Sequence, residues 1–142
     1  MALWIQLLAA TLLITLAIIV HGTGVVITTK LFKHESVHLK GRKLFAREFR
    51  LMVPMALCLF ALHVAEIYVF ALFFLVFGDV RPFDEALYAS ASAYTTLGIH
   101  DGTLDEWKLV GAFEGLAGFL LIGWSAAVFV TDMEKILRNW KL

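Results

Sequence analysis

The sequence predicts an all-α integral membrane protein with three transmembrane helices and one shorter helix that enters the membrane only partway. Of the 142 residues, 61% are hydrophobic and only 17% are charged, which is too little polar surface for a water-soluble domain of this length. Three apolar stretches are each long enough to cross about 30 Å of hydrocarbon as a helix. The single cysteine, Cys58, lies inside one of these stretches, so no internal disulfide can form.

The first segment, residues 1–29, is expected to be a transmembrane helix with an apolar part from about Leu3 to Ile27. It lacks the basic start and the small-residue cleavage site of a secretory signal peptide, and its apolar core is long. We therefore expect it to remain in the protein as a span.

The second segment, residues 30–50, carries seven basic residues against two acidic ones. Apolar side chains recur among the lysines and arginines, which favours a short amphipathic helix on the membrane surface, interrupted near Gly41. The alternative is a solvated basic loop that only fixes orientation. The apolar positions are Leu39, Leu44, Phe45 and Phe49.

The remaining chain is expected to form two more spans, from about Leu51 to Phe77 and from about Leu109 to Thr131, followed by a short tail over residues 132–142. Between these spans, the apolar piece from about Phe83 to Thr96 is too short to cross the membrane. Non-helical backbone at membrane depth is tolerated only where protein or water covers it. The piece therefore favours a re-entrant helix.

The distribution of charge predicts the orientation. The segment from Asp79 to Lys108 carries two basic and six acidic residues, whereas residues 30–50 and the tail are richer in lysine and arginine than in acids. By the positive-inside rule, residues 30–50 and the C-terminus are cytoplasmic, and the N-terminus and the Asp79–Lys108 segment lie outside. The formal net charge is zero, so nothing suggests a nucleic-acid partner.

A polar string follows the short helix, and it carries the most specific signal in the chain. Its Thr-Thr-x-Gly-x-x-Asp order resembles the selectivity filter of tetrameric potassium channels. Further pieces, including Tyr94–Gly98, Trp107–Leu116 and Leu121–Ser125, are similar to small bacterial members of the two-transmembrane ion channel family that have one extra N-terminal span. The string is Thr95, Thr96, Leu97, Gly98, Ile99, His100 and Asp101.

This resemblance implies a potassium-channel-like homotetramer in the bacterial cell membrane. Residues 51–131 would form the pore domain, with an outer helix, a pore helix, a filter and an inner helix. Backbone carbonyls and a threonine hydroxyl would replace the water that a permeating cation loses. In the inner helix, Gly118 falls where the family often has a hinge, and Gly123 falls where small residues let inner helices approach. The implied function is potassium conduction, with no enzyme activity and no cofactor other than the permeant cation.

Two residues depart from the family pattern. Ile99 stands where the family has an aromatic residue, usually Tyr, and His100 stands where it has a second glycine. The side chain at His100 disfavours the backbone angles that glycine adopts there. A weakly selective cation channel and a non-conducting assembly therefore remain open as alternatives. Because histidine titrates near physiological pH, we also expect external acid to reduce cation flux by protonating His100. Equal currents at about pH 8 and about pH 5.5, which lie on either side of the ordinary histidine pKa, with His100→Gly no different, would exclude this.

Two acidic residues lie within the spans, where a charge is costly and normally faces protein or water. Glu114 is expected either to brace the pore helix, through Ser90, Ser92 or Tyr94, or to line a cavity. Glu66 follows His63 by three residues, so the two share a helix face. A structural polar pair and a proton or metal site both remain possible for them.

One motif points to a different class of function. His34-Glu35-Ser36-Val37-His38 matches the H-E-x-x-H signature of zinc metalloproteases, in which two histidines on one helix face bind zinc and the glutamate acts as a base. A membrane zinc peptidase is thus the alternative from another class, although no third ligand is evident. Metal binding at His34 and His38, or at His100, is a weaker hypothesis than no metal binding at these residues.

Overall fold

The computed structural model describes residues 2–38, 44–98, 103–104 and 106–138, without the side chains of residues 36–38, 44–48, 136 and 137. The described residues form four α-helices: α1 (Leu3–His38), α2 (Leu44–Phe77), α3 (Phe83–Tyr94) and α4 (Lys108–Arg138). Three of them, α1, α2 and α4, are long and apolar enough to cross a membrane. The prediction of an all-α chain with three helices of membrane-spanning length and hydropathy is confirmed for this part of the chain.

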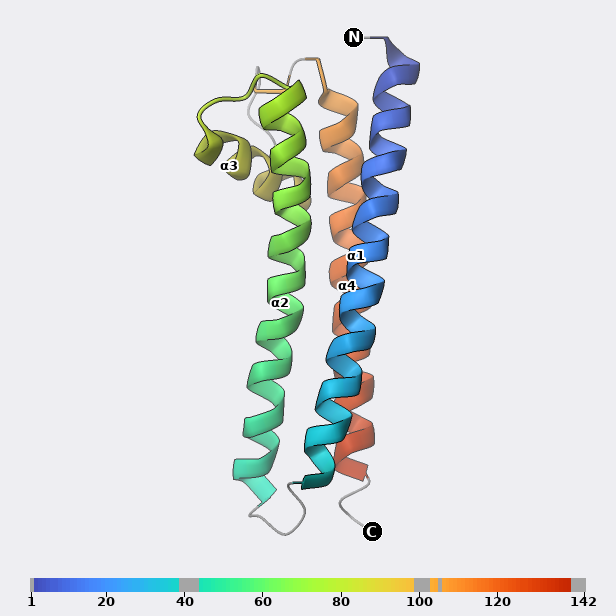
Figure 1. Ribbon diagram of the computed structural model, residues 1–142, viewed down its shortest axis with the longest axis vertical. Coiled ribbons are helices and arrows are strands. Elements are labelled where there is room, and N and C mark those ends of the chain that lie inside the picture. The colour runs from blue at the N-terminus through green and yellow to red at the C-terminus, as the bar shows by residue number, and fades with distance from the viewer. Residues whose placement is uncertain (1, 39–43, 99–102, 105, 139–142) are drawn as a thin grey trace.

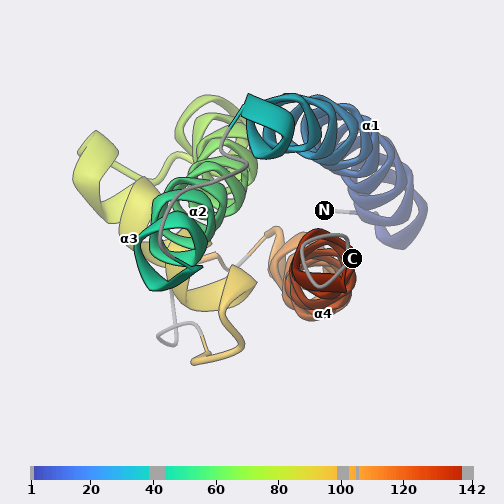
Figure 2. The same ribbon diagram turned by 90° about the horizontal axis from the view of Figure 1, so that it is seen from below.

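The three long helices lie side by side, and the short α3 lies beside one end of the bundle, the end at which α1 begins (Figure 1). Seen along the bundle, α3 lies on the side of α2 away from α1 (Figure 2). Contacts join α3 to α2 and α4, and α1 to the same two helices. The helices α2 and α4 therefore connect α1 to α3.

Each long helix continues beyond the apolar stretch that the sequence marks. α1 runs to His38 instead of Ile27, α2 begins at Leu44 instead of Leu51, and α4 ends at Arg138 instead of Thr131. Within the segment 30–50, where a short amphipathic helix was expected, the described residues belong to the long helices: residues 30–38 continue α1 and residues 44–50 begin α2, while residues 39–43 lie outside the described residues. Hydropathy marks only the part of a helix that suits hydrocarbon, and the backbone hydrogen bonds continue into water.

Two hydrogen bonds between α1 and α4 show that these helices run parallel. The Leu109 amide donates to the Gln6 side chain (3.2 Å) near the start of both helices, and the Thr29 hydroxyl donates to Asp132 (2.7 Å) near their ends. The same number of residues separates the two contacts on each helix, and at 1.5 Å rise per residue they lie about 35 Å apart. This distance is close to the thickness of a bilayer's hydrocarbon core.

The buried apolar core is concentrated where α3 meets the bundle. Side chains from all four helices contribute to it, including Ala17, Phe70, Phe74, Ala86 and Val110. A smaller cluster of Leu51, Met55 and Met133 lies toward the opposite end. Many large apolar side chains on α1, α2 and α4 remain exposed, as expected of helices that face lipid.

Candidate functional site

The end of α3 lies deep within the bundle. The Tyr94 hydroxyl, in the last residue of α3, donates a hydrogen bond to Glu66, which precedes the end of α2 by eleven residues, or about 16 Å of helix. Farther along the chain, the Trp107 indole donates to the carbonyl of Phe77 (2.9 Å), the last residue of α2. Tyr94 therefore lies deeper along α2 than Trp107 does.

Two glycines of α4 allow this close approach. A Cβ atom at Gly118 would collide with the carbonyl oxygen of Tyr94, and one at Gly115 would lie 2.9 Å from the carbonyl oxygen of Ala93. Small residues permit such backbone contact between helices in membranes. The structure therefore gives Gly118 a packing role, whereas its expected role as a hinge stays a prediction.

Helix α3 ends in a Schellman motif. The Leu97 amide donates to the Ser92 carbonyl (3.0 Å), the Thr96 amide donates to the Ala93 carbonyl (2.9 Å), and Thr96 has a left-handed φ of 60°. This region is costly for a β-branched residue, and strained backbone of this kind gathers at functional sites. Gly98, two residues later, also has a positive φ, of 97°.

These hydrogen bonds fix the direction of three consecutive peptide groups. The amides of Thr96, Leu97 and Gly98 all point back at carbonyls in the last turn of α3. In a trans peptide the carbonyl points opposite to the amide of the next residue. The carbonyls of Thr95, Thr96 and Leu97 therefore point away from α3, and no backbone amide of the described residues donates to them.

The segment that carries these carbonyls is exposed on the surface of the single chain. Residues Thr95 to Gly98 are exposed, and Leu97 is 84% exposed. A hollow of about 440 Å³ adjoins it, between Thr95, Thr96 and the face of α4 that carries Phe119 and Gly123. Nothing lies within 4 Å of a Cβ atom added at Gly123. Ile99, His100 and Asp101, the outer part of the string, lie outside the described residues.

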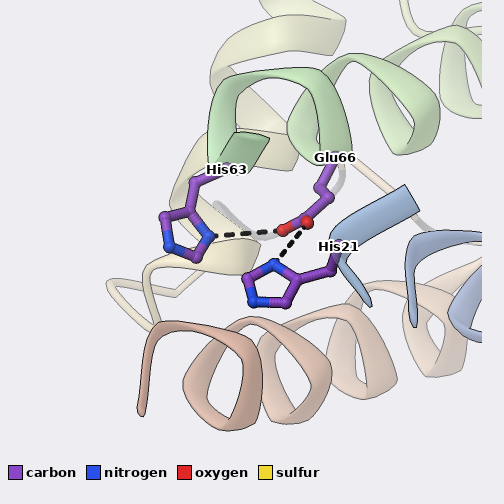
Figure 3. Close-up of side chains that lie close together, drawn as sticks. All are labelled: His21, His63 and Glu66. Carbon is purple, nitrogen blue, oxygen red and sulfur yellow. Dashed lines mark hydrogen bonds and ion pairs between the residues drawn. The ribbon is translucent and has the colours of Figure 1, made fainter. Parts of the chain in front are cut away.

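A polar cluster contacts the end of α3, and three of its side chains, from α1 and α2, lie together in Figure 3. We define it as His21, His63, Glu66 and Tyr94. The Glu66 carboxylate accepts hydrogen bonds from His21 Nδ1 (2.8 Å) and from the Tyr94 hydroxyl, and His63 Nδ1 lies 2.8 Å from that hydroxyl and 3.3 Å from the carboxylate. All these hydrogen bonds form together if both imidazoles carry their proton on Nδ1.

The polar cluster also contains the one group of three potential metal ligands among the described side chains. One ligand atom each from His21, His63 and Glu66 lies within 4.8 Å of the others, and such a set is compatible with Zn²⁺. However, the donors converge on the carboxylate itself, so a metal ion would have to replace hydrogen bonds that already satisfy these atoms. The geometry favours a structural network.

The cluster extends the expected His63–Glu66 pair by a residue from the first span. His21 is fully buried, and its Nε2 lies 3.4 Å from the Ser125 hydroxyl of α4. Sequence reasoning missed this residue, although an imidazole within an apolar span is itself a signal, because polar groups there normally have protein partners.

Glu114 forms a second polar contact with α3. Its Oε1 lies 2.5 Å from the hydroxyl of Ser90, one of the three partners that the sequence suggested, and that hydroxyl also lies 2.8 Å from the Ile67 carbonyl. Ser92, another suggested partner, is buried, and its backbone carbonyl accepts hydrogen bonds from the Leu97 and Gly98 amides at the end of α3. Whether these contacts brace a filter stays a prediction.

The protease-like motif lies on the last turns of α1. His34 and Glu35 are exposed there, and the side chain of His38 is not among those described. Neither His34 nor Glu35 belongs to the group of three potential ligands. No third ligand for this motif emerges from the described side chains.

Comparisons with known protein families, with curated proteins and with solved structures found no match for this chain. The functional reading therefore depends on the geometry of the site.

Proposed function

We propose that four copies of this chain surround a pore that conducts monovalent cations, with potassium as the default ion. In this proposal α3 is a re-entrant pore helix. Its last residue contacts α2 about 16 Å from the end of that helix, which is roughly half the thickness of the hydrocarbon core. Irregular backbone at that depth needs protein or water around it, and a water-filled pore would provide that environment.

The observation that carries the proposal is that the Thr95, Thr96 and Leu97 carbonyls point away from α3 and accept no backbone amide of the described residues. Oxygens without amide partners are the ligands that a dehydrated cation requires. The negative end of the α3 dipole lies at the same place and also favours a cation. One chain supplies only one wall of such a site, and four copies would close a ring.

The three carbonyls belong to the inner half of the filter-like string. In a channel of the resembling family, the outer half would add further oxygen rings, and Ile99 and His100 alter that half here. Fewer rings would weaken discrimination between potassium and sodium. A weakly selective cation pore is therefore the second outcome that the experiment must distinguish.

Cation flux into liposomes containing the purified protein tests the proposal. We expect potassium flux, a smaller sodium flux and none of N-methylglucamine, together with a tetramer after chemical cross-linking. Equal potassium and sodium fluxes would favour the weakly selective pore. A tetramer that passes no cation would support the non-conducting assembly, and a monomer or dimer in a bilayer would exclude a pore of this kind.

Two matched variants connect the flux to the filter-like segment. Gly98→Ala places a Cβ atom on a residue with φ of 97°, so we expect it to reduce flux strongly. Gly22→Ala is the control, because its added Cβ atom meets only the Trp124 ring at an ordinary 3.6 Å. The peptidase alternative predicts bound zinc and proteolysis that His34→Ala abolishes, and neither is expected here.

A further inference from the structure

A groove between α1 and α4 lies toward the end of the bundle at which α4 finishes. Its volume is about 520 Å³, and residues from α1 and α4 line it. The lining changes character along the groove, from apolar and aromatic residues to lysines. The residues that matter here are Val25, Trp124 and Val128 in the apolar part and Lys30, Lys33 and Lys135 in the basic part.

The Thr29–Asp132 hydrogen bond locates this change of character along the helices. Trp124 precedes Asp132 by eight residues, so it lies about 12 Å deeper in the bundle, and Lys135 lies about one helical turn in the other direction. Because Asp132 marks one end of the roughly 35 Å between the two α1–α4 contacts, the apolar part of the groove lies at hydrocarbon depth. The lysines lie at the level of the lipid headgroups.

The groove has a net positive charge. Asp132 is the only acidic residue in its lining, and this carboxylate is buried and accepts a hydrogen bond from Thr29. Lys30 and Lys135 are exposed at the mouth. A ligand that fits must therefore combine an anionic group at the headgroup level with an apolar chain that extends toward the bilayer centre.

We propose that this groove binds one anionic phospholipid, with its phosphate at Lys30 and Lys135 and an acyl chain along Trp124 and Val25. A basic pocket between transmembrane helices is a known form of headgroup site, and each lysine near the surface changes anionic-lipid preference by about a factor of five. This inference requires only that the three long helices span a membrane. It stands whether or not the protein conducts ions.

Trp124 lines the groove and provides an intrinsic reporter. The protein is reconstituted into phosphatidylcholine vesicles that contain the same fraction of either brominated phosphatidylglycerol or brominated phosphatidylcholine, because bromine quenches tryptophan fluorescence on contact. The Trp124 signal is the difference between the unmodified protein and Trp124→Phe. We expect brominated phosphatidylglycerol to compete for the groove at least about fivefold better than brominated phosphatidylcholine.

Two double variants make the test specific. Lys30→Gln with Lys135→Gln should reduce the preference for phosphatidylglycerol by at least about fivefold, with Lys33 left in the lining. Arg50→Gln with Arg138→Gln removes the same charge at the same end of the bundle, outside the groove lining, and should retain the preference.

Three results would overturn the proposal. Equal quenching by the two brominated lipids would show that the groove does not select an anionic headgroup. A preference that is undiminished by loss of Lys30 and Lys135 would place the selectivity elsewhere. Absence of quenching by either lipid would show that another occupant, such as a helix of a second copy, covers the groove.

Discussion

Tyr94 is the residue at which the contacts of α3 converge. Its hydroxyl contacts Glu66 and His63 of the polar cluster, and its carbonyl oxygen packs against Gly118 of α4. The next residue, Thr95, begins the segment whose carbonyls point away from α3. The position of that segment therefore depends on contacts that α2 and α4 make with a single tyrosine.

The first prediction concerns Gly118. We expect Gly118→Ala to destabilise the protein by about 1–3 kcal/mol, because the added Cβ atom meets the backbone of Tyr94 and one of the helices must shift. Thermal unfolding in detergent measures this change. Gly22→Ala, which makes the same substitution without a clash, should be neutral or stabilising by up to about 1 kcal/mol through helix propensity. Equal stability of the two variants would contradict the packing of α3 against α4.

The second prediction concerns the proton between Ser90 and Glu114. A hydroxyl has one hydrogen, so its contacts with the Ile67 carbonyl and with Glu114 are both hydrogen bonds only if the glutamate donates one of them. The other oxygen of Glu114 has no hydrogen-bond partner among the described residues. We expect Glu114→Gln, which keeps a donor, to change the unfolding free energy by less than about 1 kcal/mol, and Ser90→Ala to cost about 1–3 kcal/mol. Unfolding curves of the two variants test this, and a larger loss in Glu114→Gln would show that an ionised carboxylate is required.

At the scale of elements, α1 is part of the bundle and more than a membrane anchor. Its side chains cap the start of α4 through Gln6, reach the polar cluster through His21 and bind Asp132 near the end of α4 through Thr29. Because α1 makes no helix contact with α3 among the described residues, its influence on α3 passes through α2 and α4, and Glu66 of α2 is one such link.

The third prediction tests the contact between α1 and α4. Thr29→Val keeps the shape of the side chain but leaves the buried Asp132 carboxylate without this donor, so we expect a loss of about 1–3 kcal/mol in unfolding free energy. Thr15→Val is the control, since the hydroxyl of Thr15 bonds only to the Thr11 carbonyl within α1. Denaturant titration in mixed micelles should separate the two variants, and indistinguishable curves would show that the Thr29 bond contributes nothing.

At the scale of the whole molecule, the two ends of the bundle differ in charge. The loop between α2 and α4 is acidic, and the opposite end carries most of the lysines and arginines. The orientation expected from this asymmetry places the basic end in the cytoplasm. The filter-like segment would then open toward the outside, and the lysine-bearing groove would face the inner leaflet.

The fourth prediction tests this orientation. In a chain in which Cys58→Ala removes the single cysteine, a cysteine introduced as Glu106→Cys should react with a membrane-impermeant maleimide in intact cells. A cysteine introduced as Arg138→Cys should react only after permeabilisation. The reversed pattern would invert the topology, and labelling of both in intact cells would contradict an odd number of spans.

Much of the helical framework was predictable from the sequence, because it depends on local properties. Long apolar runs require helices in hydrocarbon, and the short run beginning at Phe83 was recognised with its first residue correct and its end at Tyr94 instead of Thr96. The predicted ends of the long helices were less accurate, since hydropathy reports the bilayer and hydrogen bonding continues past it. The tetramer and the filter were inferred from resemblance and stay predictions.

The contacts at the site were harder to predict, because hydropathy does not fix the rotation of a helix about its axis or its depth beside its neighbours. Glu66 was recognised as a polar residue in a span, but its partner His21 lies 45 residues away in sequence. Glu114 was narrowed to three partners, and only the packing of α4 against α3 selected Ser90.

The sequence by itself therefore determined the number of spans, the place of the short helix and the asymmetry of charge. Only the tertiary structure decided that α3 ends deep in the bundle at Tyr94, that the three carbonyls after it point away from α3, and that α1 and α4 enclose a groove with lysines at one end. Composition dictates which segments must become helices in a membrane. Which side chains of different helices contact one another depends on how closely those helices can approach.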